Sequence, residues 1–348
     1  MALAMLSNVN TVPFASRSPA FSRRNFLARC GMGMGTVGLA GLLPSAGATE
    51  ATSPLAPKAP HFRARAKRVI HFFLNGGPSH VDTFDPKPRL QQDKGKPLPF
   101  EKPKLERTKT GNLLPSPWSF ARHGASGVEV SELLPGLASR IDDVCVIRSM
   151  VADNINHTGA ALQLCTGEQA FSRPSVGSWL TYGLGSENDN LPGFIVVSPA
   201  PVFQGAQLWS SSFLPSVHQG TLVRDPAVPI ADLGGPDADR RRQRAKLDAL
   251  ARFNRRHAAD RPGGADLEAR IASFETAFRM QMEAPEAFDL AAETAATHRL
   301  YGTDEEPTRL FGRQCLLARR LAERGVRFVQ LFSAPFNNFW DQHREIGR

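Results

Sequence analysis

A helix that leads directly into a strand, over residues 309–332, constrains the fold more than any other segment of this sequence. Apolar side chains recur at helical spacing from Leu310 to Leu321, and Gly325 stands where such a helix would end. The apolar run from Val326 to Phe332 has the length and composition of a buried strand. A helix followed at once by a buried strand is typical of α/β proteins with a parallel sheet.

Other segments extend this alternation of helices and strands. Residues 69–75 ("VIHFFLN") form a mainly apolar run, which suits a strand buried on both faces of a parallel sheet. The other predicted strands are 144–150 and 193–198, and the predicted helices are 131–141 (capped by Ser131), 156–166 and 175–185. We therefore expect an α/β fold with a mostly parallel sheet flanked by helices. Residues 236–300 have helical spacing and predict a helical insertion, whereas the Pro- and Lys-rich residues 86–127 predict surface loops.

Polar residues follow three of the predicted strands. In open parallel sheets, ligands bind beyond the carboxyl ends of the strands, which meet at one edge. The three clusters are Ser79, His80, Asp82 and Asp85; Asn154, Asn156, His157 and Thr158; and Asn337, Asn338, Asp341 and His343. The sequence therefore predicts a site at this edge of the sheet.

The first and third clusters predict a divalent metal site. Carboxylate and imidazole groups that arrive from several strand ends suit zinc, magnesium or calcium. The candidate ligands are Asp82, Asp85, Asp341 and His343. Asp341 and His343 can face one ion if they lie on a loop, whereas on a helix they would diverge. The alternative for Asp82 and Asp85 is structural, because aspartate commonly shapes turns and caps helices.

The second cluster predicts catalytic groups, Thr158 and His157. Thr158 would lie at the start of a helix, where free backbone N–H groups and the helix dipole favour an anion. A hydroxyl activated there by a metal could attack phosphorus or sulfur. The alternative is that Thr158 only caps the helix.

Residues 1–48 are typical of a twin-arginine export signal. Arg23 and Arg24 precede a Gly-rich apolar stretch over residues 30–43, and a small-residue sequence at 46–48 suits cleavage. A membrane anchor is the alternative, but a stretch of roughly 14 residues is too short to span a bilayer. We therefore expect the twin-arginine translocase as a partner, a periplasmic or extracellular location and no stable membrane span. Residues 49–66 predict a linker.

Charge and cysteine content exclude two further classes of protein. The chain has a net charge of +9, but residues 1–48 hold four arginines and no acids, so the remainder has 38 basic against 33 acidic residues, or +5. This mild, dispersed excess argues against a nucleic-acid partner. Beyond the signal the cysteines are Cys145, Cys165 and Cys315, widely spaced in apolar segments, so we expect buried free thiols rather than a disulfide framework.

Several motifs together resemble one known family. They are the twin-arginine signal, "NGGPSHVDTFDPKP", "NHTGAALQLCTGE", "YG…CLLARRLAERGVRFVQL" and "WDQH". In combination they resemble the secreted, planctomycete-rich family catalogued as domain of unknown function 1501, over nearly the whole mature chain. That family is in turn similar to the alkaline phosphatase and sulfatase superfamily.

The resemblance implies roles for several residues. The metal-binding aspartate after the first strand would be Asp82, and later ligands would be Asp341 and His343. No cysteine stands at His157 or Thr158, where sulfatases carry their formylglycine, so a threonine nucleophile of phosphatase type is the remaining implication. Family members continue beyond the "WDxH" motif, so we expect 67–348 to be an alkaline phosphatase-like domain that is incomplete at its C-terminus.

Two functions of different classes follow from these expectations. The first is an exported, metal-dependent hydrolase of phosphate or sulfate esters. The second is a catalytically inactive binding or scaffold protein of the cell envelope that keeps the same fold.

Overall fold

Four parallel strands form the central sheet in the part of the protein that the structure describes. The computed structural model describes residues 54–101, 110–224, 240–259, 285–333 and 340–341. The strands are β1 (Val69–Phe73), β4 (Phe194–Val197), β5 (Thr221–Val223) and β6 (Phe328–Phe332), in the spatial order β1-β6-β4-β5. Every neighbouring pair in this sheet is parallel, so the expected α/β class and mostly parallel sheet are confirmed.

The strand order explains the burial of each strand. β6 lies between β1 and β4 and is buried along its whole length, as its mainly apolar sequence predicts. β1 was expected to be buried on both faces, and this was wrong. It lies at the edge of the described sheet, and Phe72 in its middle is 47% exposed.

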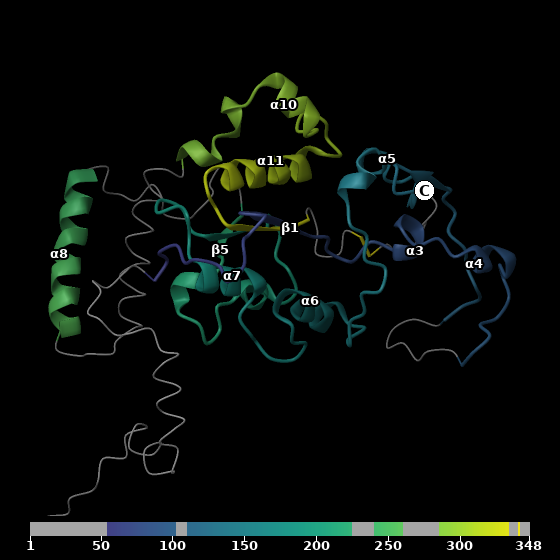
Figure 1. Cartoon of the computed structure of the whole chain (residues 1–348), viewed down its shortest axis with the longest axis horizontal. Helices are drawn as coiled ribbons and strands as arrows, with labels where there is room; N and C mark the ends of the chain where they lie inside the picture. The colour runs from purple at the N-terminus through teal and green to yellow at the C-terminus, as the bar shows by residue number, and fades with distance from the viewer. Residues whose placement is uncertain (1–53, 102–109, 225–239, 260–284, 334–339, 342–348) are drawn as a thin grey trace, which may run out of the picture. The chain divides into compact units, whose positions relative to one another are not determined.

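Helices cover both faces of the sheet, and the side chains of β4 pack against the helices on each face. Successive side chains of a strand point to opposite faces. Ile195 and Val197 pack in one cluster with α11 (Arg309–Glu323), whereas Phe194 and Val196 pack in another with α6 (His157–Thr166). Figure 1 shows α11 on one side of the strands and α6 and α7 (Val176–Leu184) on the other. The result is a helix–sheet–helix sandwich.

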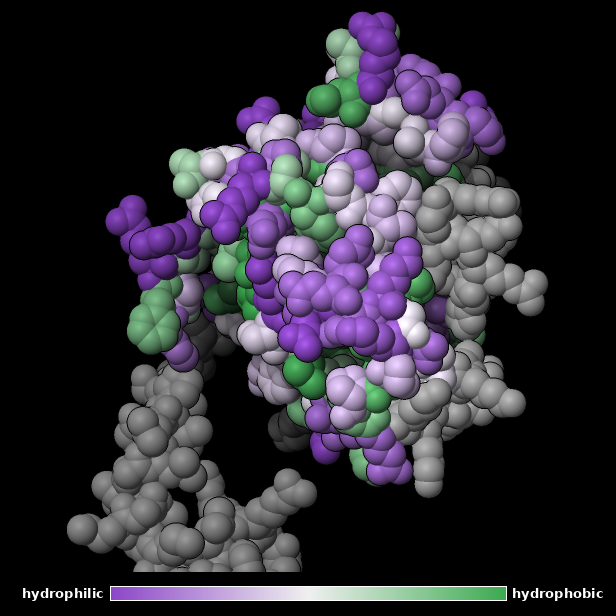
Figure 2. Space-filling model, turned by 90° about the vertical axis from the view of Figure 1, so that its right-hand side faces the viewer, coloured by the Kyte–Doolittle hydropathy of each residue, from purple (hydrophilic) through white to green (hydrophobic). Residues whose placement is uncertain are grey.

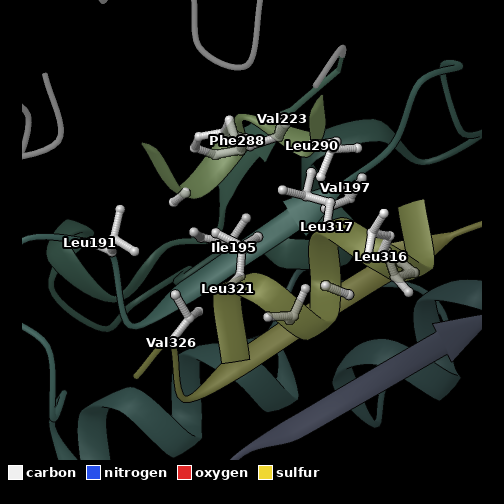
Figure 3. Packing of buried hydrophobic residues seen from close by; sticks show 14 residues of the cluster. Leu191, Ile195, Val197, Val223, Phe288, Leu290, Leu316, Leu317, Leu321 and Val326 are labelled. Carbon is white, nitrogen blue, oxygen red and sulfur yellow. The ribbon is translucent and has the colours of Figure 1, made fainter. Parts of the chain in front are cut away.

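The α11 face forms the larger core. Figure 3 shows Leu317 and Leu321 of α11 packed beside Val197 and Ile195 of β4. Gln314, on the same helix, donates from Nε2 to the carbonyl of Phe332 at 2.9 Å, which ties α11 to the end of β6. The predicted helix and strand over 309–332 are thereby confirmed, and so are the predicted helices at 156–166 and 175–185.

The segment before α6 differs from the sequence expectation. Residues 131–141 do not form one helix. β2 (Phe120–His123) and β3 (Val128–Ser131) form an antiparallel hairpin that takes Ser131 into a strand, and Pro135 starts the next helix because it has no N–H to donate inside one. Only short helices follow, α5 (Pro135–Ala138) and η1 (Ile141–Asp143). The predicted strand at 144–150 is wrong, because these residues form no strand and are mostly exposed.

The residues from 86 to 127 are also more ordered than predicted. They contain α4 (Pro88–Gln92) and β2 in addition to loops, and α4 follows the short helix α3 (His80–Thr83). A small separate core of Val130, Ala138 and Ile141 lies under this part of the chain, with Phe84 packed against it. The hairpin therefore supports the segment that follows β1.

Helices predominate in the described part of the predicted insertion, residues 240–259 and 285–300. They include α8 (Arg240–Ala259), η4 (Leu290–Ala292) and α10 (Ala295–Leu300). The predicted break at Pro262–Gly264 lies outside the described residues. Two further short helices, η2 (Gly205–Trp209) and η3 (Ser216–His218), join β4 to β5.

One face of the molecule is mainly hydrophilic. Figure 2 shows a face on which hydrophilic residues predominate and hydrophobic ones are scattered. Among the helices of the described segments, none is long and apolar enough to cross a membrane. All three cysteines expected to be free are free, but Cys145 is exposed, because the segment around it runs over the surface and is not a strand of the sheet.

Candidate functional site

The ends of β1 and β6 are joined by a pair of buried polar residues, Asn75 and Ser333. The backbone N–H of Asn75 donates to Oγ of Ser333 at 2.9 Å, and Nδ2 of Asn75 donates to the carbonyl of Ser333 at 3.0 Å. Both residues are about 4% exposed. This pair extends the β1–β6 contact past the last ladder residues and fixes the carboxyl edge of the sheet.

Gly76, directly after Asn75, makes room for the returning chain. Its φ of +96° is a conformation that side chains rarely adopt, and a Cβ there would collide with the backbone nitrogen of Asp341. Trp340 donates its backbone N–H to the carbonyl of Asn75 at 2.9 Å. The glycine after β1 therefore allows both a sharp turn and the close approach of Trp340 and Asp341.

The N-terminus of α6 is fixed by three local features. Asn156 caps the helix through Oδ1, which accepts the N–H of Thr158 at 2.9 Å. Gln163 reaches back to Asp153, accepting its N–H at 2.9 Å and donating to its carboxylate at 2.6 Å. Gly159 has no side chain, which leaves space for the amide of Asn154. These contacts hold His157 at the start of the helix.

His157 and Asp341 meet at this edge, although 184 residues separate them in the sequence. Nε2 of His157 lies 3.1 Å from Oδ2 of Asp341, and their side chains are 43% and 25% exposed. The ring of Phe203 lies nearly parallel to the imidazole, with 6.4 Å between ring centroids and 19° between planes. The pair is therefore oriented by two different elements and remains open to solvent.

A cavity of about 730 Å³ adjoins this pair. This volume is within the range of small-molecule sites. The lining comes from the end of β1, the loop before α6, α6 itself and the segment after β4. Its members include Phe73, Asn75, Gly76, Met150, Val151, His157, Gln163, Leu164, Phe203 and Leu208. His157 is thus shared by the cavity and the polar pair.

The predicted residues of the first cluster lie in and after α3, outside the lining of this cavity. Asp82 is inside α3, and its backbone N–H donates to the carbonyl of Ser79 at 3.2 Å. The carboxylate of Asp85 contacts Lys87 at 2.6 Å and His80 at 3.2 Å. The hydrogen bond from Lys87 is the main cause that holds the pKa of Asp85 below its ordinary value, and the bond from His80 adds to it.

Thr158 and His343 complete the predicted set. Thr158 is half-buried in the first turn of α6, beside His157, and Asn156 rather than Thr158 caps the helix. His343, Asn337 and Asn338 lie outside the described residues. Within the described part of the chain, no three His, Cys, Asp or Glu side chains are grouped closely enough to hold a metal ion.

Sequence reasoning missed three residues of this site. Asn75 and Ser333 join the two strand ends, and Phe203 stacks on His157. A polar residue directly after an apolar strand was a usable signal for Asn75 and Ser333. Nothing in the local sequence distinguishes Phe203 from an ordinary surface aromatic residue, because its partner lies 46 positions away by residue number.

The fold and the site define an α/β protein with a histidine–aspartate pair and an adjoining cavity at the carboxyl edge of a parallel sheet. Residues 66–348 match the family described as "Protein of unknown function (DUF1501)", and the chain belongs to that family. Neither a curated protein nor a solved structure matches the chain.

Proposed function

We propose that this protein is an exported, metal-dependent hydrolase of phosphate or sulfate esters, with an alkaline phosphatase-like arrangement of its sheet and site. The observation that carries the proposal is the contact of 3.1 Å between His157 and Asp341 beside a cavity of small-molecule size. Open α/β sheets place their ligands at this edge. The twin-arginine sequence supports the export part of the proposal.

The carboxylate of Asp341 is the proposed first ligand of one divalent ion, since carboxylate oxygen is a common zinc donor. His157 lies 3.1 Å from that carboxylate and would act beside the ion rather than bind it. The further ligands in this proposal are His343 and Asp82, and Asp85 is a weaker candidate because its carboxylate contacts Lys87. A bound ion would supply charge stabilisation for the ester oxygens.

The chain's own residues would perform the remaining tasks. Asp341 orients the imidazole of His157 through the Nε2 contact. His157 can then take or return a proton at the cavity, which commonly contributes about 10²- to 10⁴-fold to a rate. Thr158 is next to it in the first turn of α6 and is the proposed nucleophile.

The test is turnover of 4-nitrophenyl phosphate and 4-nitrophenyl sulfate by the purified protein. Zinc, magnesium, calcium and manganese are each added after chelation, and bound metal is measured by elemental analysis. We expect metal-dependent turnover that falls at least about 100-fold in His157→Ala. The control is His257→Ala, in an exposed position of α8. Turnover that is independent of metal, or unchanged in His157→Ala, would overturn the proposal.

A binding protein without catalysis is the second candidate. The observation that favours it is the position of Thr158, which is outside the lining of the cavity, while the lining itself is largely apolar. Such a protein would bind a ligand at the cavity and turn over neither ester, with or without metal.

A further inference from the structure

The wall of the cavity leaves large apolar side chains open to solvent. Val151 is 87% exposed, Met150 69%, Phe203 55% and Leu164 53%, and all four line the cavity. Single exposed apolar residues are ordinary, but a group of them around one hollow marks a binding surface. Phe73 and Leu208 continue the apolar wall inward.

The polar side chains of the wall are already engaged with the protein. Nδ2 of Asn75 donates to Ser333, and both ends of the Gln163 amide bond Asp153. Among the described lining residues, His157 is the titratable side chain that faces the cavity. A sugar or other polyol needs several hydrogen-bonding side chains to replace its water, and this wall does not offer them.

We infer that the ester hydrolysed at this site carries an aryl group, which lies in the cavity against Phe203, and that carbohydrate esters are poor substrates. The inference rests on the proposed function, because His157 links the cavity to the reacting ester. The ring of Phe203, already stacked near the imidazole, would pack on the aryl group and hold the ester oxygen beside His157.

The first experiment measures binding without chemistry. The probe is 1-naphthol, which has no ester bond, titrated by its fluorescence, with glucose as the competing polyol. We expect Phe203→Ala and Val151→Ser each to weaken 1-naphthol binding about 10-fold, since each removes apolar contact area. The matched control is Phe213→Ala, because Phe213 is 64% exposed and packs against Trp179 outside the cavity lining.

The second experiment separates this inference from the proposed function. It compares kcat/KM for 1-naphthyl phosphate and sulfate with kcat/KM for glucose 6-phosphate and 6-sulfate. A preference of at least about 10-fold for the naphthyl esters, lost in Phe203→Ala, supports the inference.

Binding of 1-naphthol that depends on Phe203, without turnover of any ester, supports the aryl site and contradicts the hydrolase. Failure of 1-naphthol to bind, equal binding by Phe203→Ala and Phe213→Ala, or displacement by glucose overturns the aryl site. If a second copy or another segment of the chain fills the cavity, 1-naphthol will not bind, and this result also overturns the aryl site.

Discussion

At the scale of single residues, the role of Thr158 distinguishes a covalent mechanism, in which its hydroxyl attacks the ester, from a mechanism in which Thr158 only packs in the helix. Its hydroxyl is in the first turn of α6, and its backbone N–H is occupied by the cap residue Asn156. A nucleophile must keep its hydroxyl, whereas a residue that only packs must keep its shape.

Two substitutions of Thr158 separate its hydroxyl group from its side-chain shape. Thr158→Ser keeps the hydroxyl and should retain turnover within about 10-fold, whereas Thr158→Val keeps the shape and should lose turnover at least about 100-fold. Initial rates with 4-nitrophenyl phosphate, and thermal melting to verify folding, provide the measurement. Full activity in Thr158→Val would exclude the threonine as nucleophile.

His218 predicts how stability depends on pH. The residue is 1% exposed, its ring packs edge-on to Tyr182, and burial with the positive charge of Lys58 lowers its pKa from 6.5 to about 4. Between these values the unfolded chain holds a proton on this histidine that the folded chain does not. The contribution of His218 to stability is therefore complete above about pH 6.5 and is lost as pH falls towards 4.

The loss amounts to roughly 3 kcal/mol, because the pKa values of the unfolded and folded states differ by about 2.5. Urea unfolding at pH 7.5, 6, 5 and 4.5 should show this fall in the wild type. His218→Asn removes the titrating group and should flatten the pH dependence in this window, whatever its stability at pH 7.5. If the free energy of unfolding falls equally with pH in the wild type and in the variant, groups other than His218 cause the fall.

At the scale of elements, the turn after β1 contains two adjacent glycines with different tasks. Gly76 and Gly77 both have positive φ, +96° and +77°. A Cβ at Gly76 would collide with the backbone of Asp341, whereas a Cβ at Gly77 would meet no atom within 4 Å. Gly76 therefore serves the packing of Trp340 and Asp341, and Gly77 serves only the turn.

Gly77→Ala should lower the free energy of unfolding by about 1 to 2 kcal/mol, the cost of a left-handed alanine. Gly76→Ala should cost more, because it adds displacement of the Asp341 backbone to the same strain, and it should also reduce esterase turnover through the His157 contact. Chemical unfolding and kcat measure both effects. Equal losses in the two variants would mean that the close approach of Asp341 contributes nothing.

At the scale of the whole molecule, export requires the twin arginine. A conservative change of both residues, Arg23→Lys with Arg24→Lys, keeps the charge of the signal but removes the guanidinium pair. The precursor should then remain in the cytoplasm, as cell fractionation and immunoblotting would show. Arg17→Lys with Arg29→Lys, in the same segment, is the matched control and should leave export unchanged. Normal export of the double variant at 23 and 24 would exclude this route.

The sequence by itself determined those helices and strands whose formation depends on residues close together in the chain. The helix and strand of residues 309–332 and the helix that begins after Asn156 were predictable, because periodicity, caps and terminal glycines act within a few residues. β4 was predictable for the same reason, since a short apolar run between turn residues suits a buried strand. The helix expected at 131–141 was wrong, because Ser131 pairs with Phe120 in the hairpin and Pro135 lacks the N–H that a helix interior needs.

Only the tertiary structure decided which elements lie side by side. The same apolar pattern occurs in β1 at the edge and in β6 at the centre, and a strand's sequence does not specify its neighbours. The Asp341 carboxylate and the His157 imidazole were both recognisable as candidates, but their contact depends on the return of the chain past Gly76 and on the capped start of α6. Phe203 joined the site without any local signal. The sequence specifies the chemistry of each residue, whereas the contact across 184 positions depends on how distant elements pack. Parallel pairing brings the end of β6 beside the end of β1, and packing of α6 brings His157 to the same place.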